Sequence, residues 1–186
     1  MPRRMDYMKR INIILIMLLV LFSGCAKASN STIFLKFDSN GNYNGFSNLS
    51  KKYTAEQAEK DGCYVHVNSE IVGGEQFWKD FIQNASNNKN SSIRIANIYQ
   101  DETYFIDIFY LDGYYHAFSS GSEDLQDNKF KYLLTLEGTL PNAAKSGTVT
   151  ILTDDKELTY LDVMWTFLSS DMHYKESISP FKFLFF

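Results

Sequence analysis

The sequence SIRIANIYQDETYFIDIFYLDGYYHAFS, residues 92–119, decides the fold of this chain. It is rich in Ile, Tyr and Phe, and its apolar residues alternate with others at the period of a β-strand. Asp112-Gly113 is a strong signal for a two-residue hairpin turn, and Asp101-Glu102 is the candidate turn before it. The stretch therefore predicts an antiparallel β-meander with strands at 92–99, 103–111 and 114–119.

The flanking sequence adds helices and further strands. Thr54-Ala55-Glu56-Gln57 matches a capping box that opens a short helix. Apolar residues at helical spacing predict a longer helix over 75–85 and another that begins near Thr159 and Asp162. Further strands are predicted at 63–67, 129–137, 148–153 and 181–186.

Together these elements predict one α+β domain over residues 53–186, a predominantly antiparallel sheet with helices packed on one face. Aromatic and apolar side chains of the two longer helices are expected to cover the isoleucines of the meander. The helix residues are Phe77, Trp78, Phe81, Met164 and Trp165, and the sheet residues are Ile93, Ile95, Ile106 and Ile108.

The N-terminus has the pattern of a secretory signal peptide over residues 1–24. Lys9-Arg10 precedes a mainly apolar run from Ile11 to Phe22, which is too short to span a bilayer as a helix. Ser23-Gly24-Cys25 then resembles the bacterial lipobox, in which small residues precede a cysteine that takes a diacylglyceryl group and becomes the mature N-terminus. Phe22 stands where leucine is usual. An ordinary cleaved signal or an uncleaved anchor is the alternative.

Lipidation at Cys25 predicts a position on the cell membrane, facing outside the cytoplasm. Each buried CH₂ group contributes about 0.8 kcal/mol, and two acyl chains anchor a protein stably where one does not. The membrane, reached through the lipid anchor, is therefore one expected partner. Residues 25–52 are rich in Ser, Asn and Gly, and this composition predicts a flexible tether between the lipid and the domain. Ile33-Phe34-Leu35-Lys36-Phe37 interrupts the tether and is a candidate for an added strand that docks on the domain.

The charge balance disfavours nucleic acid as a partner. Loss of residues 1–24 removes four basic residues and one acidic residue, so the formal net charge changes from -4 to -7. Phosphate contacts dominate the affinity for nucleic acids, and the remaining chain has no cluster of Lys and Arg. A ligand or a protein partner in the cell envelope is the expectation that remains.

The sequence contains no recognisable cofactor or metal motif. His66, His116 and His173 lie far apart and form no ligand pair at short helical or turn spacing. There is no Gly-rich phosphate loop and no Gly-x-Ser-x-Gly elbow. If Cys25 carries lipid, Cys63 has no disulfide partner. The apolar residues beside Cys63 favour its burial. Nothing in the local sequence supports a nucleophile pair of Cys63 with His116. We therefore predict no cofactor and no metal, and assign no catalytic residue.

One group of residues in the meander is a candidate binding surface. The turns set a register in which Arg94, Asp107 and His116 share one face, with Arg94 and His116 each diagonal to Asp107. With Asp101-Glu102 as the first turn, Asp107 opposes Ala96. The same face carries the aromatic residues Phe105, Phe109, Tyr114 and Phe118.

Two interpretations of this surface are open. In the functional one, the aromatic side chains are the walls of a ligand groove, and the Asp107 carboxylate is held between a guanidinium and an imidazole. In the structural one, an ion pair lies on the less buried face among aromatic residues that pair across strands. A change of one residue in the first turn would move Arg94 to the opposite face.

Several short segments resemble landmarks of small uncharacterised lipoproteins from Gram-positive bacteria. They are Tyr53-Thr54-Ala55-Glu56-Gln57-Ala58 with Asp61-Gly62-Cys63, Ser92-Ile93-Arg94-Ile95-Ala96, Phe130-Lys131-Tyr132-Leu133 and Ser169-Ser170. The resemblance covers roughly residues 53–170 and implies a lipid-anchored α+β domain in the cell envelope. It implies no activity and no site residues.

Two functions of different classes follow from these observations. The preferred one is a membrane-anchored extracytoplasmic lipoprotein that binds a ligand or a protein partner without catalysis. It rests on the lipid anchor, the acidic aromatic-rich domain and the lack of a recognisable catalytic group. The alternative is an extracytoplasmic hydrolase that uses Asp107 and His116 as an acid/base pair, which requires both side chains in a concave pocket.

Replacement of Cys25 tests the predicted anchor. We expect Cys25→Ser to abolish labelling by a fatty-acid analogue and to stop cleavage of the signal, because the thiol that takes the lipid is missing. Metabolic labelling and gel mobility measure the two effects. A Cys25→Ser protein that is processed and fractionates with membranes like the unaltered protein would contradict the prediction.

Overall fold

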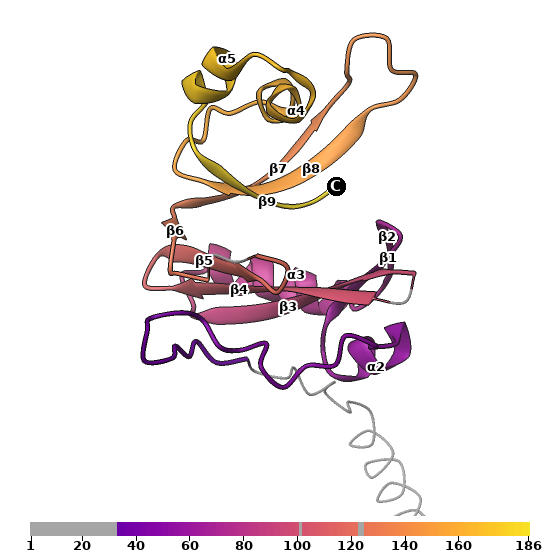
Figure 1. The fold of residues 1–186 in the computed structure, drawn as a ribbon, viewed down its shortest axis with the longest axis vertical. Helices are drawn as coiled ribbons and strands as arrows, with labels where there is room; N and C mark the ends of the chain where they lie inside the picture. Colours follow the sequence, from indigo (N-terminus) through magenta and orange to yellow (C-terminus); the bar gives the residue numbers. More distant parts are fainter. Residues whose placement is uncertain (1–32, 101, 123–124) are drawn as a thin grey trace, which may run out of the picture.

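The computed structural model describes residues 33–100, 102–122 and 125–186, so the predicted signal peptide and Cys25 lie outside the described residues. The described residues form a mixed α+β fold with mostly antiparallel sheets, as the sequence predicted. Their strands build two sheets, stacked one above the other with helices and an N-terminal segment around them (Figure 1). No helix within these ranges is long and apolar enough to cross a membrane.

The larger sheet has six strands in the order β2-β1-β3-β4-β5-β6. All neighbouring strands are antiparallel except β1 and β3, which are parallel. The predicted Asp112-Gly113 turn joins β4 to β5 in the predicted register, and both residues have the positive φ that such a turn needs. The strands are β1 (Tyr64–Val67), β2 (Glu70–Gly73), β3 (Ser91–Tyr99), β4 (Glu102–Leu111), β5 (Tyr114–Ser119) and β6 (Lys129–Phe130).

The turn between β3 and β4 corrects the predicted register. The last pair before the turn is Tyr99 with Glu102, so the turn begins one residue earlier than the sequence predicted. Gln100 has a φ of 51°, the left-handed conformation that the turn requires at this position. Asp107 therefore lies directly opposite Arg94 and not opposite Ala96. Because the pairing shifts by two residues, each side chain keeps its predicted face.

The smaller sheet has three antiparallel strands in the order β7-β8-β9. The single strand predicted over 129–137 is divided at Lys131, whose backbone N–H donates to the Asp154 carboxylate at 2.9 Å instead of continuing a ladder. The chain changes sheets at this residue, so the one predicted sheet is corrected to two. The strands are β7 (Tyr132–Gly138), β8 (Gly147–Thr153) and β9 (Phe181–Phe185).

Helix α3 (Glu75–Ser86) and the smaller sheet cover the same face of the larger sheet. The aromatic side chains of α3 pack against the isoleucines of the meander, as predicted. Met164 and Trp165 do not reach those isoleucines, because helix α4 (Tyr160–Leu168) packs on the outer face of the smaller sheet. Trp165 is 39% exposed, so the position predicted for this second helix is wrong.

Strand β8 explains why α4 lies one layer further out. Val149 and Ile151 pack under α4, whereas Leu152 packs against the larger sheet, and all three are fully buried. Alternate residues of one strand thus fill two different cores. The N-terminus of α4 has the predicted cap, since Thr159 and Asp162 form a capping box. Helix α5 (Met172–Ser177) follows and was not predicted.

The other face of the larger sheet carries helix α2 (Ala55–Lys60), which begins at the capping box of Thr54. Ala58 of this helix packs with Cys63, Val65 and Ala96 in a small core of its own. Figure 1 shows α2 and the segment before it below the larger sheet, on the side away from the smaller sheet. The meander is therefore covered on both faces.

Candidate functional site

The face predicted as a ligand groove is covered by residues 33–49 of the same chain, which we call the N-terminal cover. The sequence predicts a flexible tether here, and the packing corrects that prediction. Tyr43 of the cover is 2% exposed, and its ring stacks on Phe118 with 4.2 Å between the centroids. The Tyr43 backbone N–H donates to the Leu125 carbonyl at 2.9 Å. The folded region therefore begins well before residue 53.

A tight turn shapes the N-terminal cover. The Asp38 carboxylate accepts hydrogen bonds from the backbone N–H groups of Asn42 and Asn40. These bonds hold the pKa of the Asp38 carboxyl below its usual value. Phe37 and Tyr43 pair across the turn as an isolated antiparallel bridge. Polar residues that are typical of a linker thus direct the Tyr43 side chain onto the sheet.

Asp107 lies in the middle of the covered face with no exposed surface. Arg94 donates to it twice, from Nε to Oδ1 and from Nη2 to Oδ2, at 2.6 Å each. The Tyr43 hydroxyl donates to Oδ2 at 2.6 Å. Nη2 of Arg94 also donates to the Gly45 carbonyl of the cover at 3.1 Å. Both carboxylate oxygens are therefore occupied by groups of the protein itself.

Burial and hydrogen bonding act in opposite directions on this cluster. Burial raises the pKa of the Asp107 carboxyl above its usual value, and the hydrogen bonds from Arg94 and Tyr43 oppose that rise. Burial and the nearby carboxylate raise the pKa of the Tyr43 hydroxyl, so the hydroxyl stays protonated and donates. The guanidinium lies 5.8 Å from the Phe46 ring and 5.6 Å from the Phe105 ring. This arrangement suits a structural ion pair.

His116 has a different partner from the one predicted. Its Nδ1 lies 2.7 Å from Oδ1 of Asp127, in the loop before β6. His116 is opposite Phe109, as the predicted register requires, but Arg94 and Tyr43 occupy the oxygens of Asp107. Asp107 and His116 therefore form no acid/base pair, and the hydrolase interpretation finds no support at these two residues.

The predicted aromatic residues fall into two groups. Phe105, Phe109 and Phe118 are buried beneath the cover. Tyr114 is half-buried at the end of its strand, with the Lys129 ammonium 4.9 Å from its ring centroid. The sequence pattern indicated only residues 33–37 as a segment that docks on the domain, because polar turn residues separate them from Tyr43, Phe46 and Leu49. The available signal is a density of large apolar residues that a solvated linker does not need, namely Ile33, Leu35, Phe37, Tyr43, Phe46 and Leu49.

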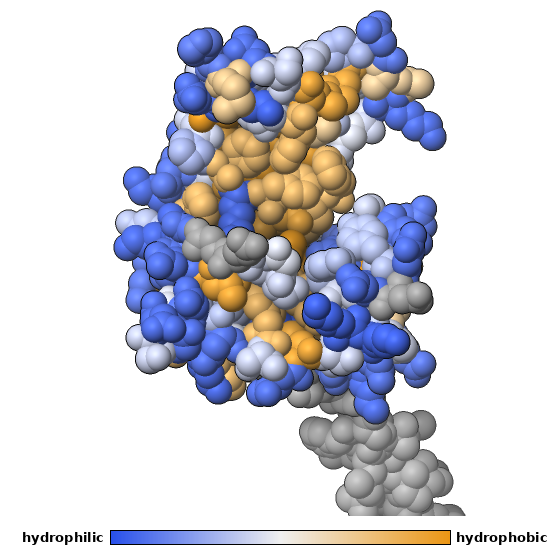
Figure 2. Space-filling model, viewed as in Figure 1, coloured by the Kyte–Doolittle hydropathy of each residue, from blue (hydrophilic) through white to orange (hydrophobic). Residues whose placement is uncertain are grey.

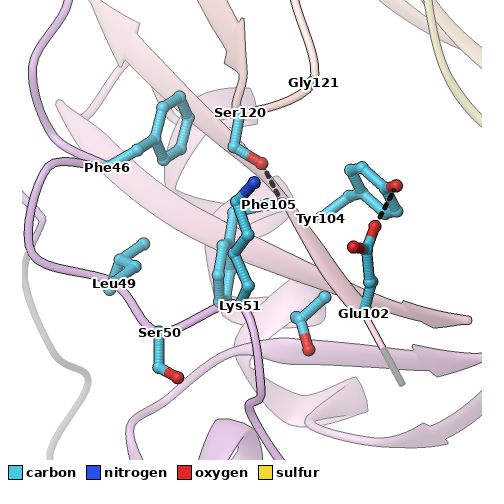
Figure 3. Close-up of a pocket in the computed structure, with 10 residues that line it drawn as sticks. Phe46, Leu49, Ser50, Lys51, Glu102, Tyr104, Phe105, Ser120 and Gly121 are labelled. Atoms are coloured by element: carbon cyan, nitrogen blue, oxygen red, sulfur yellow. Dashed lines mark hydrogen bonds between the residues drawn. The ribbon is translucent and has the colours of Figure 1, made fainter.

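A cavity of about 300 Å³ remains where the cover ends, and we call it the cover cavity (Figure 3). Phe46 and Leu49 of the cover and Phe105 of β4 form its apolar wall. Figure 3 shows Lys51 crossing the cavity, with Glu102 on the side away from the cover. The other lining residues are Ser50, Thr103, Tyr104, Ser120 and Gly121.

Most polar groups of the cover cavity already have partners within the protein. The Tyr104 hydroxyl donates to the Glu102 carboxylate at 2.6 Å. The Phe105 backbone N–H donates to the Ser120 hydroxyl oxygen at 2.8 Å. The Lys51 ammonium forms no ion pair with any residue that the structure describes. The Lys51 ammonium is therefore available to a ligand, and the Tyr104 hydroxyl occupies only Oε2 of Glu102.

Other reactive groups offer little chemistry. Nowhere in residues 33–100, 102–122 and 125–186 do three or more His, Cys, Asp or Glu side chains gather so as to hold a metal ion. Cys63 is 2% exposed beneath α2, and burial raises the pKa of its thiol to about 12. The thiol is protonated at neutral pH and shielded from solvent, which is unfavourable for a nucleophile.

No protein-family model, curated protein or solved structure matches this chain. The candidate site is therefore defined by the geometry of the described residues. That geometry separates a buried structural cluster around Asp107 from an open cavity beside it.

Removal of the Tyr43 hydroxyl tests the role of the buried cluster. We expect Tyr43→Phe to lower the free energy of unfolding by about 1.5–3 kcal/mol, because it deletes a hydrogen bond to a buried carboxylate. Urea unfolding measures the change. Tyr132→Phe is the matched control, since that tyrosine is 36% exposed, and it should change the stability by less than about 0.5 kcal/mol. Equal effects of the two substitutions would contradict the assignment.

Proposed function

We propose that this chain is a lipid-anchored extracytoplasmic protein whose folded domain binds a small amphiphilic ligand without transforming it. The observation that carries the proposal is the cover cavity, where an apolar wall meets one unpaired ammonium group. Its volume of about 300 Å³ is at the lower end of the range for small-molecule sites, which are mostly apolar with a few placed polar groups.

The charges at the rim favour a zwitterion with an apolar side chain. Lys51 offers an ammonium to a carboxylate, and Glu102 offers a carboxylate to an ammonium. Phe46 and Leu49 provide the apolar surface against which a side chain packs. A free apolar amino acid, or the end of a short peptide, combines these groups in one molecule.

The lining residues support binding more than catalysis. Among the described residues that line the cover cavity there is no His, Cys or Asp. The two serine hydroxyls there accept backbone hydrogen bonds, Ser50 from Lys52 and Ser120 from Phe105. A serine nucleophile needs an adjacent general base, and neither serine hydroxyl hydrogen-bonds to a basic side chain among the described residues.

The predicted anchor places this cavity near a membrane. If Cys25 carries the lipid, seven residues lie between it and Ile33, the first residue of the cover, which makes eight residue steps. A fully extended chain spans at most about 3.6 Å per residue, so the tether reaches no more than about 29 Å. The ligand is therefore expected close to the outer surface of the cytoplasmic membrane, in a Gram-positive envelope if the family resemblance holds.

Thermal unfolding with three defined probes tests the proposal: L-leucine, L-phenylalanine and the dipeptide leucyl-leucine. We expect at least one probe to raise the Tm, because a ligand at 100 times its Kd adds about 2.7 kcal/mol to the stability of the folded state. Lys51→Gln should weaken this binding roughly ten-fold by removing a charge-assisted hydrogen bond.

Lys89→Gln is the matched control, because Lys89 is exposed and lies outside the cavity. It should bind the probes like the unaltered protein. The proposal is overturned if no probe raises the Tm at millimolar concentration, or if Lys51→Gln and Lys89→Gln bind equally well.

A further inference from the structure

A second cavity of about 180 Å³ lies between the two sheets, on the side where the C-terminal strand β9 passes β1 and β3. We call it the intersheet cavity. Phe183, Phe185 and Ile106 contribute to its apolar wall. Figure 1 shows the C-terminus beside the β1–β2 hairpin, and Figure 2 shows the molecule hollowed on this side, next to a band of hydrophobic residues. None of the described residues that line this cavity has a carboxylate, ammonium or guanidinium side chain.

His66 of β1 lines the intersheet cavity and is only 2% exposed. Its Nε2 has no hydrogen-bond partner among the residues that the structure describes. The rings of Tyr64 and Phe185 contact the imidazole edge-on, at 4.6 and 4.9 Å between centroids, and fix its orientation. Buried polar atoms are almost always hydrogen-bonded, so a buried Nε2 without a partner calls for an explanation.

Burial favours the neutral form of the His66 imidazole. Burial lowers the pKa of His66, and the interaction with the neighbouring Asn97 side chain opposes this only in part. A neutral imidazole carries one N–H and one lone pair, so Nε2 either donates or accepts, depending on the tautomer. A hydroxyl group both donates and accepts, and it therefore satisfies Nε2 in either tautomer.

The walls and the size of the cavity define the rest of the ligand. Aromatic side chains on the wall favour an aromatic ring through edge contacts. A cavity of about 150 Å³ lined by apolar residues holds benzene, so about 180 Å³ accommodates one substituted ring. The described side chains that line the cavity carry no carboxylate, ammonium or guanidinium group, which disfavours an ionised ligand because its desolvation is not compensated.

We propose that the intersheet cavity is a second binding site, for an uncharged ligand that combines one aromatic ring with a hydroxyl group bonded to Nε2 of His66. A free phenol and the side chain of a peptide tyrosine share this chemistry. The site is separate from the cover cavity, although Tyr104 borders both. The proposal does not depend on the zwitterion assigned to the cover cavity.

Histidine nitrogen NMR on the full chain tests the proposal directly. The chain has three histidines, so His116 and His173 serve as internal controls in one spectrum. We expect p-cresol to shift the Nε2 signal of His66 saturably and to leave the other two unchanged. Toluene has the same ring and methyl group without the hydroxyl, and it should bind roughly ten-fold more weakly, because it leaves Nε2 unpaired.

Two further arms complete the design. N-acetyl-tyrosinamide distinguishes a peptide tyrosine from a free phenol as the natural ligand. If it binds as tightly as p-cresol, the ligand is a peptide tyrosine. If it binds more weakly, the ligand is a free phenol. His66→Phe keeps the aromatic contacts and should bind p-cresol no better than toluene. The proposal is overturned if p-cresol leaves the His66 signal unchanged, or if toluene binds the unaltered protein as tightly as p-cresol. Either result would mean that water alone satisfies Nε2.

Discussion

A carboxylate with no access to water must have partners for both oxygens, and this requirement organises one whole side of the molecule. Asp107 on β4 meets it with Arg94 on the neighbouring strand and with Tyr43, which lies 64 positions earlier in the chain. The Tyr43 ring fills the space over Phe118 while its hydroxyl completes the ion pair. One contact thus joins the N-terminal cover to the sheet by apolar and polar interactions together. Loss of Arg94 would leave a buried charge uncompensated, and loss of Tyr43 would remove a hydrogen bond from the buried carboxylate, which is why the cover belongs to the fold.

The two cavities lie where the layers of the fold end. The larger sheet is covered by α3 and the smaller sheet on one face, and by α2 and the N-terminal cover on the other. The cover cavity opens beyond the last apolar contact of the cover, at Leu49. The intersheet cavity lies at the edge between the sheets, where Phe185 closes over His66. Both cavities therefore have walls formed by strands of the larger sheet. The N-terminal cover borders one cavity and β9 borders the other, and sites beside such a scaffold commonly bind ligands.

Local signals in the sequence predicted the elements well, and contacts between distant segments were harder to predict. Asp112-Gly113 fixed the β4–β5 register because both residues adopt positive φ readily. The preceding turn was misplaced by one residue, since Gln100 carries no such preference and takes positive φ only in the folded context. The change of sheet at Lys131 depends on a hydrogen bond to Asp154, which no local pattern reveals. For the site, the Arg94–Asp107 pair followed from alternation along the strands, but Tyr43 did not, because its role depends on the tertiary structure.

The N-terminal cover is part of the folded domain. Hydrogen exchange at the Tyr43 amide tests it most directly, because this N–H donates to the Leu125 carbonyl beneath the cover, at 2.9 Å. If the hydrogen bond from Tyr43 to Asp107 holds the cover on the sheet, the Tyr43 amide should be protected from exchange nearly as well as the amides of β4. Amides of a central strand typically exchange only when the whole fold opens. Exchange at the rate of an unstructured chain, with β4 still protected, would contradict the account.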